Sequence, residues 1–469
     1  MAFPIDLCDG CSVYVLLRAI AGIALRWYYR DIHVEGIDRI PRRRPLLLVV
    51  NHPNALVDAL LVAWAIPRRV LITAKSTIFA NPLAGALLRF MGVLPLYRVK
   101  DQASGGRADP ARNRGTFEAI HRALSRGGTV LIFPEGITHD EPSLAPLKTG
   151  AARMALQARD AGDVEGLAIV PIGLTFERKD APRSRVLVQV GEPIAMDGWR
   201  EPDGSPAADA LTAEIETRLR AVTFNYATVD DATRAVRLAS LIAALFEPVP
   251  TLGVVDRRLG AETGIARRIE ELSSRLPYAD ASLRAQADQL VRRLDAVQRV
   301  AAKHGVLIED VGITLEARLA LRFVVREGWL LAVGGPIALW GRLNHWLPFR
   351  AARLIAMRSV DSAADPAMRT LVAGAAFVLL TYLAQTAVVA AIWNPLVAAA
   401  YLVSLPIAAD INFYLSDRLT RAVSRARAWL RFRRDPGLHQ RLMDELSLLR
   451  ADVLAFDREL GDRVAPSPA

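Results

Sequence analysis

The 469 residues of the chain are enough for two or more domains with a substantial buried core. Hydrophobic residues make up 52% of the sequence and its mean hydropathy is +0.22, values that are high for a wholly soluble protein and indicate membrane contact. The net charge of +10 suits an anionic membrane surface, and we expect no nucleic acid partner because the basic residues accompany no nucleic-acid-binding motif.

The N-terminal segment, residues 1–39, is expected to lie on the bilayer surface rather than to cross it. Residues 12–30 are apolar, but they are interrupted by Arg18 and Arg26 and end in the aromatic residues 27–29. An interfacial helix with its aromatic rings at headgroup level fits this pattern better than a spanning helix.

The two cysteines, Cys8 and Cys11, form a CxxC pair. A zinc site needs a second pair of ligands, and no thioredoxin-like pattern surrounds this one. We therefore expect reduced thiols here, with neither a metal nor a redox role.

Residues 40–199 alternate short β-branched apolar runs with helical stretches. The expected strands include 45–50, 69–75, 128–134 and 167–176, and the expected helices include 55–66, 112–126 and 147–160. This alternation predicts an α/β domain whose sheet is covered by helices. Sites in such domains are usually built on the loops that follow the strands.

Residues 200–327 are expected to be soluble and mostly helical, rich in arginine, alanine and leucine, with no recognisable chemistry. The membrane region, residues 328–415, follows them. Its first uncharged stretch, 328–341, is too short to span a bilayer, so we expect it to be re-entrant or interfacial.

A longer apolar run lies between Arg369 and Asp410, where no residue is charged. An Asn-Pro pair at 394–395 divides it into residues 371–393, which are long enough to span, and a shorter piece that spans only if it continues through DINFYL. A turn at this pair predicts a helical hairpin, although a buried helical pair in a soluble core would show the same pattern.

Arginines flank both outer ends of this run, and they are dense in the basic helical C-terminal tail, residues 416–469. Because cytoplasmic loops carry an excess of arginine and lysine, both ends are expected to face the cytoplasm. The predicted location is the cytoplasmic face of the inner (plasma) membrane, with the hairpin as anchor. The basic residues 418–434 are expected to contact anionic lipid, unless they form an ordinary solvated helix face.

A candidate site lies in the stretch NHPNALVD, where His52 directly follows an apolar strand and Asp58 lies six residues later. On one straight helix six residues would turn Asp58 about 240° away from His52. The two side chains can meet only if His52 lies in a turn and Asp58 in the first turns of a helix, for which Asn54 is a candidate cap. A carboxylate on one ring nitrogen leaves the other free to accept a proton. A simple capped turn would use the same residues.

Three further blocks follow in strand and loop contexts: GVLPLYR at 92–98, FPEG at 133–136 and VPI at 170–172. Together with NHPNALVD, and in this order, they resemble the glycerolipid acyltransferase family, whose members make lysophosphatidate and phosphatidate. The resemblance covers about residues 30–195. It implies a mixed sheet covered by helices, no metal and no cofactor, with acyl-CoA or acyl carrier protein as the donor substrate.

The resemblance also implies roles for individual residues. His52 would be the general base for an acceptor hydroxyl, with Asp58 holding its ring, and no covalent acyl-enzyme would form. Arg98 would bind the acceptor phosphate, because a guanidinium matches phosphate with paired hydrogen bonds. Glu135 and Gly136 would belong to the acceptor side, with Glu135 on a glycerol hydroxyl or orienting Arg98.

The sequence departs from the usual family pattern at three places. Five residues separate His52 from Asp58 instead of four. This spacing resembles that of a bacterial and fungal branch of the family. Members of that branch are long, carry membrane helices near the C-terminus and include glycerol-3-phosphate acyltransferases. Pro95 replaces an aromatic residue, and Thr138-His139 replaces Arg-Ser. We interpret His139 as a solvated loop residue.

Two lysines are singled out by this sequence alone. The chain has only five lysines, yet Lys75 lies at an expected strand end and Lys148 in APLKTG, both in the domain that carries the motifs. We expect each to offer a compact positive charge to phosphate, with chance placement as the alternative.

The sequence therefore predicts a membrane-associated O-acyltransferase that acylates 1-acylglycerol-3-phosphate. Its partners would be membrane lipids and an acyl thioester donor carried by CoA or acyl carrier protein. One alternative is glycerol-3-phosphate, or another lysophospholipid, as acceptor. An alternative of another class is a non-catalytic lipid-binding or scaffold protein on the same fold.

Overall fold

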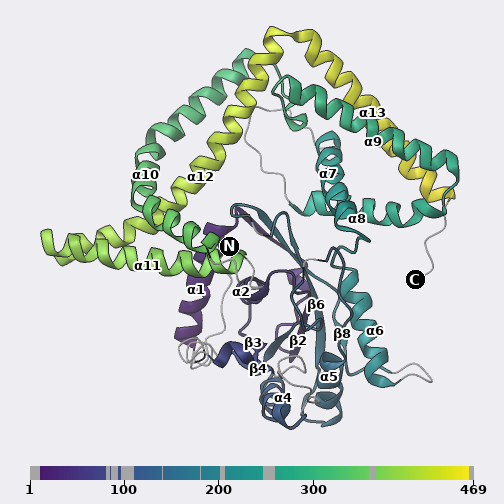
Figure 1. Cartoon of the computed structure of the whole chain (residues 1–469), viewed down its shortest axis with the longest axis vertical. Helices are drawn as coiled ribbons and strands as arrows, with labels where there is room; N and C mark the ends of the chain where they lie inside the picture. Colours follow the sequence, from purple (N-terminus) through teal and green to yellow (C-terminus); the bar gives the residue numbers. More distant parts are fainter. Residues whose placement is uncertain are drawn as a thin grey trace. The chain divides into compact units, whose positions relative to one another are not determined.

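A computed structural model of the chain (Figure 1) divides it into two units: residues 1–227 with 356–372, here the α/β unit, and residues 228–355 with 373–469, here the helical unit. The structure describes residues 11–80, 85, 93–96, 110–139, 141–179, 181–200, 206–246, 259–358 and 366–463. Two residues singled out above, Cys8 and Arg98, lie outside these ranges.

A mixed sheet forms the centre of the α/β unit, as predicted. Its described strands are β1 (Asp31–Glu35), β2 (Leu46–Val50), β3 (Val70–Lys75), β4 (Leu94–Leu96), β5 (Thr129–Ile132), β6 (Ala168–Phe176), β7 (Arg185–Val190) and β8 (Ile194–Ala195). Their order is β1-β7-β6-β2-β5-β3-β4, with β8 on β6. The pairs of β6 with β7 and with β8 are antiparallel, and the others are parallel.

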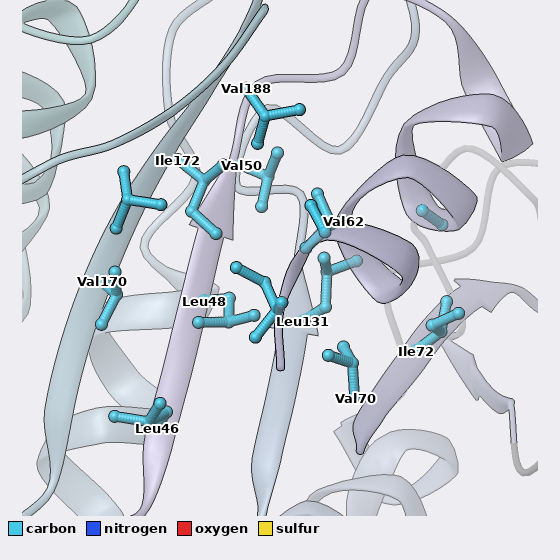
Figure 2. Close-up of a cluster of buried hydrophobic side chains, with 14 of the residues drawn as sticks. Leu46, Leu48, Val50, Val62, Val70, Ile72, Leu131, Val170, Ile172 and Val188 are labelled. Carbon is cyan, nitrogen blue, oxygen red and sulfur yellow. The ribbon is translucent and has the colours of Figure 1, made fainter. Parts of the chain in front are cut away.

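Helices cover both faces of this sheet (Figure 1). The helix α2 (Ala55–Ala65) packs on one face, and α4 (Pro110–Ser125), α5 (Gly150–Asp160) and α6 (Ala207–Arg220) pack on the other. Strand β2 is buried along its whole length because its alternate residues enter opposite cores: Leu46, Leu48 and Val50 pack with Val62 of α2 (Figure 2), whereas Leu47 and Val49 face the other layer. Burial on both faces explains why the strand is continuously apolar.

The N-terminal helix α1 (Cys11–Tyr28) packs against α2. Tyr28 and Tyr29 are buried in a cluster with Val57 and Leu61. The prediction that these aromatic rings lie at the lipid headgroups is therefore wrong for both tyrosines, because an amphipathic pattern does not distinguish a protein core from a membrane surface. The opposite face of α1 exposes three large apolar side chains: Leu16, Ile20 and Ile23.

The described part of residues 200–327 is mostly helical, as predicted, but it is not one region, because α6 belongs to the α/β unit. The helical unit begins at residue 228. It contains α7 (Val229–Phe246), α8 (Leu259–Arg275), α9 (Ala281–Lys303), most of α10 (Ala317–Arg358) and of α11 (Pro366–Ile392), α12 (Pro395–Arg434) and α13 (Pro436–Arg463). The helix α13 packs along α9, with Leu442 and Leu449 in the same core as Leu294 and Val297. The predicted tail thus begins inside α12 and continues into a packed helix.

Three helices of the described residues are long and apolar enough to cross a membrane: Ala317–Ala351, Gly374–Ile392 and Pro395–Arg434. The stretch 328–341 does not form a short helix of its own, because it lies inside the 42-residue helix α10. Its re-entrant or interfacial placement stays a prediction. Arginines flanking such a segment can extend their charge toward the interface. The turn at 394–395 is confirmed: Asn394 caps α12 by accepting a hydrogen bond from Val397 N at 2.9 Å.

The helices α10 and α12 run antiparallel and approach closely (Figure 1). Successive residues of α10 contact residues with progressively lower numbers in α12. Glu327 pairs with Arg418, Gly341 lies against Ala408, and Asn344 accepts a hydrogen bond from Tyr401 at 2.7 Å. Small residues permit such close approach of helices in membranes, and side-chain hydrogen bonds add to it.

Gly341→Ala is expected to destabilise this helix pair by about 1–3 kcal/mol, because a Cβ at Gly341 would lie 2.3 Å from the Ala408 carbonyl oxygen. Gly335→Ala is the matched control in the same helix, since a Cβ there meets nothing within 4 Å. Thermal unfolding of the detergent-solubilised protein measures the difference. Equal melting temperatures for the two variants would rule out the close approach.

Candidate active site

The site forms at the edge of the sheet where the carboxyl ends of neighbouring parallel strands lie side by side. Strands β2 and β5 are parallel neighbours, so the turn after β2, with His52, and the turn after β5, with Glu135, must meet. The side chain of Asn51 ties the first turn to the next strand, accepting from Leu174 N at 2.7 Å and donating to its carbonyl at 3.1 Å.

His52 and Asp58 meet in the geometry predicted from their spacing. The Nδ1 atom of His52 lies 3.0 Å from Oδ2 of Asp58, with His52 in the turn and Asp58 in the first turn of α2. Asp58 is fully buried. The imidazole stacks on the Phe133 ring, 3.8 Å between centroids and 17° between planes, and its side chain is 17% exposed. The ring is thus held on two sides and accessible on the rest.

The start of α2 differs from the prediction in one respect. Asn54 occupies the N-cap position, but its side chain does not cap the helix. Instead Oδ2 of Asp58 accepts from Asn54 N at 2.7 Å, while the Asn54 amide donates to the Tyr29 hydroxyl. The next residue, Ala55, has a φ of +46°, a conformation that costs energy for a side chain with a Cβ.

This hydrogen-bond arrangement fixes the chemistry available to His52. A buried carboxylate accepts, so Asp58 favours the tautomer with a proton on Nδ1. The Nε2 atom then carries the lone pair. It can take a proton from a hydroxyl group, and Asp58 can stabilise the imidazolium that results.

Glu135 lies behind this pair and is 2% exposed. Its Oε1 atom accepts from His52 N at 2.7 Å, and its Oε2 atom accepts from Ala145 N at 2.8 Å and is bonded to Nε2 of His139. The prediction of a solvated His139 is wrong, because its side chain is 14% exposed and contacts this buried carboxylate. The predicted contacts of Glu135 with a glycerol hydroxyl or with Arg98 stay predictions.

Gly136, in the FPEG turn, lies next to the Lys148 side chain. Gly136 has a φ of +67°, which favours glycine, and a Cβ there would lie 2.8 Å from Nζ of Lys148. The backbone of Lys148 donates to the Pro134 carbonyl at 2.9 Å. Its ammonium group therefore lies over the turn that carries Glu135.

Lys75 ends β3 at the same edge of the sheet, since β3 is parallel to β5. Its register partner on β4 is Leu96, two residues before Arg98. The structure thus brings His52, Asp58, Glu135, Gly136 and Lys148 together. It places the backbone of Lys75 at the same edge of the sheet.

Lys179 is a residue that sequence reasoning missed. It follows β6, and its Nζ atom donates to the Pro53 carbonyl at 3.2 Å, next to His52. The rarity of lysine, which singled out Lys75 and Lys148, was the available signal. In the part of the chain that the structure describes, no group of three or more histidine, cysteine or acidic side chains could hold a metal.

The fold and the site together define an α/β domain with a histidine–carboxylate pair suited to deprotonating a hydroxyl. Residues 31–175 match the family model described as Acyltransferase. This domain is similar to glycerolipid acyltransferases, which confirms the resemblance seen in the four sequence blocks.

Three relatives illustrate the match. Glycerol-3-phosphate O-acyltransferase 2 of Saccharomyces cerevisiae is 35% identical over 159 residues, 32% of this chain and 21% of that protein. The 1-acyl-sn-glycerol-3-phosphate acyltransferase of Cocos nucifera is 30% identical over 191 residues, covering 39% and 56%. The alpha enzyme of that name from Mus musculus is 25% identical over 232 residues, covering 47% and 76%.

Among solved structures, the 1-acyl-sn-glycerophosphate acyltransferase PlsC of Thermotoga maritima aligns with a TM-score of 0.34 at 18% identity, covering 46% of this chain and 83% of that one. The chain spans about a fifth of the yeast relative and just over half of the coconut relative.

Proposed function

We propose that the protein is a membrane-associated O-acyltransferase that transfers a fatty acyl group from a CoA or acyl-carrier-protein thioester to 1-acylglycerol-3-phosphate, giving phosphatidate. The observation that carries the proposal is the hydrogen bond between the buried Asp58 carboxylate and Nδ1 of His52. It leaves Nε2 of a ring whose side chain is 17% exposed for proton transfer. The names of the coconut and mouse relatives support this acceptor.

In the proposed reaction, Nε2 of His52 takes the proton of the acceptor hydroxyl while the hydroxyl oxygen attacks the thioester carbonyl carbon. The new C–O bond gives a tetrahedral intermediate. Its collapse breaks the C–S bond, and the departing thiolate receives the proton from the imidazolium. Asp58 stabilises the positive charge on the ring between the two proton transfers.

Glycerol-3-phosphate is the second candidate acceptor, and one observation favours it. The yeast relative, whose name states that acceptor, has the highest identity of the three relatives described, 35%. The five-residue spacing between His52 and Asp58 resembles the same branch. The rival of another class, a non-catalytic lipid-binding protein or scaffold, does not require the buried Asp58 carboxylate to orient a histidine.

The proposed location is the cytoplasmic face of the inner membrane, with α11 and α12 as a spanning hairpin. The two-residue connection at 393–394, the length of both helices and the arginines beyond them support this arrangement. Exposed apolar side chains support contact with lipid, among them Trp329, Leu343, Leu379 and Leu396.

The test is a membrane-fraction assay with labelled acyl-CoA and acyl carrier protein donors, offering 1-acylglycerol-3-phosphate and glycerol-3-phosphate in parallel. Membranes that contain His52→Ala serve as the blank. Faster labelling of the first acceptor is the expected result, and preference for the second would establish the alternative. Transfer to neither acceptor from either donor would favour the scaffold or a different lysophospholipid.

Lys148 is predicted to contact the acceptor phosphate, since its ammonium lies over the Glu135 turn. Lys148→Met keeps most of the aliphatic part of the side chain and removes the charge. We therefore expect the acceptor KM to rise about 10-fold or more, with kcat changed little. Lys303→Met, at the end of α9, is the matched control. An unchanged KM would exclude this contact, and Lys75→Met applies the same test at the end of β3.

A further inference from the structure

We propose that His139 is a positioning residue of the active site. It fixes the carboxylate of Glu135, which in turn holds the backbone of His52. The inference rests on the proposed function only in treating His52 as the base. Nothing in the sequence pattern assigned a role to this histidine.

The hydrogen bonds around His139 define its tautomer. The backbone N–H of Glu141 donates to Nδ1 of His139 at 3.2 Å, so that nitrogen carries a lone pair. The neutral ring then has its proton on Nε2, which donates to Oε2 of Glu135. Both ring nitrogens are engaged, which distinguishes His139 from a second general base: neither nitrogen is left to accept a substrate proton.

Glu135 joins the turn after β2 to the loop that follows its own turn. Its carboxylate receives donors from the turn after β2, at His52 N, and from the loop after the FPEG turn, at Ala145 N and His139 Nε2. A buried carboxylate is stable only when its oxygens are hydrogen-bonded, and loss of one donor displaces it.

Displacement of Glu135 would move His52, because Oε1 of Glu135 holds the His52 N–H. The ring of His52 would shift relative to the place where a hydroxyl must lie. Lys148, expected to bind the acceptor phosphate, would stay held by its backbone bond to the Pro134 carbonyl, which does not involve the Glu135 side chain. A misplacement of about 1 Å costs about 100-fold in rate. The geometry thus predicts an effect on kcat rather than on the acceptor KM.

The experiment compares three variants of the full-length protein in detergent. His139→Leu removes the donor, and His139→Gln offers an amide N–H at nearly the same place. His121→Leu is the matched control, because His121 also bonds a carboxylate, Asp163 at 3.0 Å, but on the surface of α4. The readouts are kcat, the acceptor KM, the melting temperature, and the rate at which diethyl pyrocarbonate modifies His52, followed by peptide mass spectrometry.

For His139→Leu we expect kcat lowered about 10- to 100-fold with the acceptor KM within about twofold of wild type. We also expect His52 to be modified about threefold faster or more, because its turn opens more often. His139→Gln should restore both values most of the way, and His121→Leu should change neither.

Two outcomes would overturn the inference: a His139→Leu variant whose kcat and His52 modification rate both match wild type, or a His139→Gln variant no better than His139→Leu. The modification rate needs no substrate. If the wild-type protein acylates no acceptor, the proposed function fails, and the modification rates alone decide whether His139 positions His52.

Discussion

His52→Ala is expected to lower kcat for acyl transfer by about 10²- to 10⁴-fold, the range that a positioned general base contributes. Without the imidazole, the site loses the base that we propose takes the hydroxyl proton as the oxygen attacks the thioester. The acceptor KM should change little, since the groups expected to bind phosphate are elsewhere. Initial rates with labelled acyl-CoA over a range of acceptor concentrations give both constants.

Two controls sharpen this result. His52→Gln keeps a polar side chain of similar reach but cannot accept a proton, so it should be as inactive as the alanine variant. His121→Ala removes a histidine from α4, on the face of the sheet opposite α2, and should retain wild-type activity. Retention of more than about a tenth of the activity in both His52 variants would contradict the general-base role.

Sequence reasoning could predict the part of the site that is encoded locally, by strand β2 and the residues that directly follow it in the chain. The apolar run at β2, buried on both faces, and the spacing from His52 to Asp58 were sufficient to place the histidine in a turn and the acid on a helix. The parallel order of β2 and β5 then brings Glu135 to the same place.

The contacts that sequence reasoning missed join positions whose proximity depends on the folding of loops. His139 reaches Glu135 only because the chain after FPEG folds back, with Ala145 N on the same carboxylate. Lys179 reaches Pro53 from 126 residues away. No periodicity encodes such contacts, since loops carry none.

The errors at the membrane have a different physical cause. The helix α10 was underestimated because its uncharged stretch is shorter than the helix that contains it. Tyr28 and Tyr29 were assigned to a lipid surface because an apolar helix face carries no information about whether protein or lipid covers it. Only the tertiary packing on α2 distinguishes the two cases.

The second large effect is expected at Asp58, where two substitutions separate orientation from charge. Oδ2 of Asp58 accepts from both Asn54 N and His52 Nδ1, so the amide oxygen of Asp58→Asn can keep both bonds while the negative charge is lost. Because Asn54 N holds that oxygen toward His52, the tautomer is kept, and we expect kcat to fall about 10²-fold from the lost stabilisation of the imidazolium. Asp58→Ala loses the bonds as well, and kcat should fall about 10³- to 10⁴-fold.

The order of the two Asp58 variants is the decisive measurement. Their kcat values are compared at equal folded protein, because Asp58→Ala also leaves Asn54 N without its acceptor at the start of α2 and should lower the melting temperature. Asp58→Asn should melt close to wild type. If Asp58→Asn and Asp58→Ala have the same kcat, the carboxylate acts through its charge alone. If both keep more than about a third of wild-type activity, His52 acts without Asp58, and the site works by a mechanism other than the one proposed.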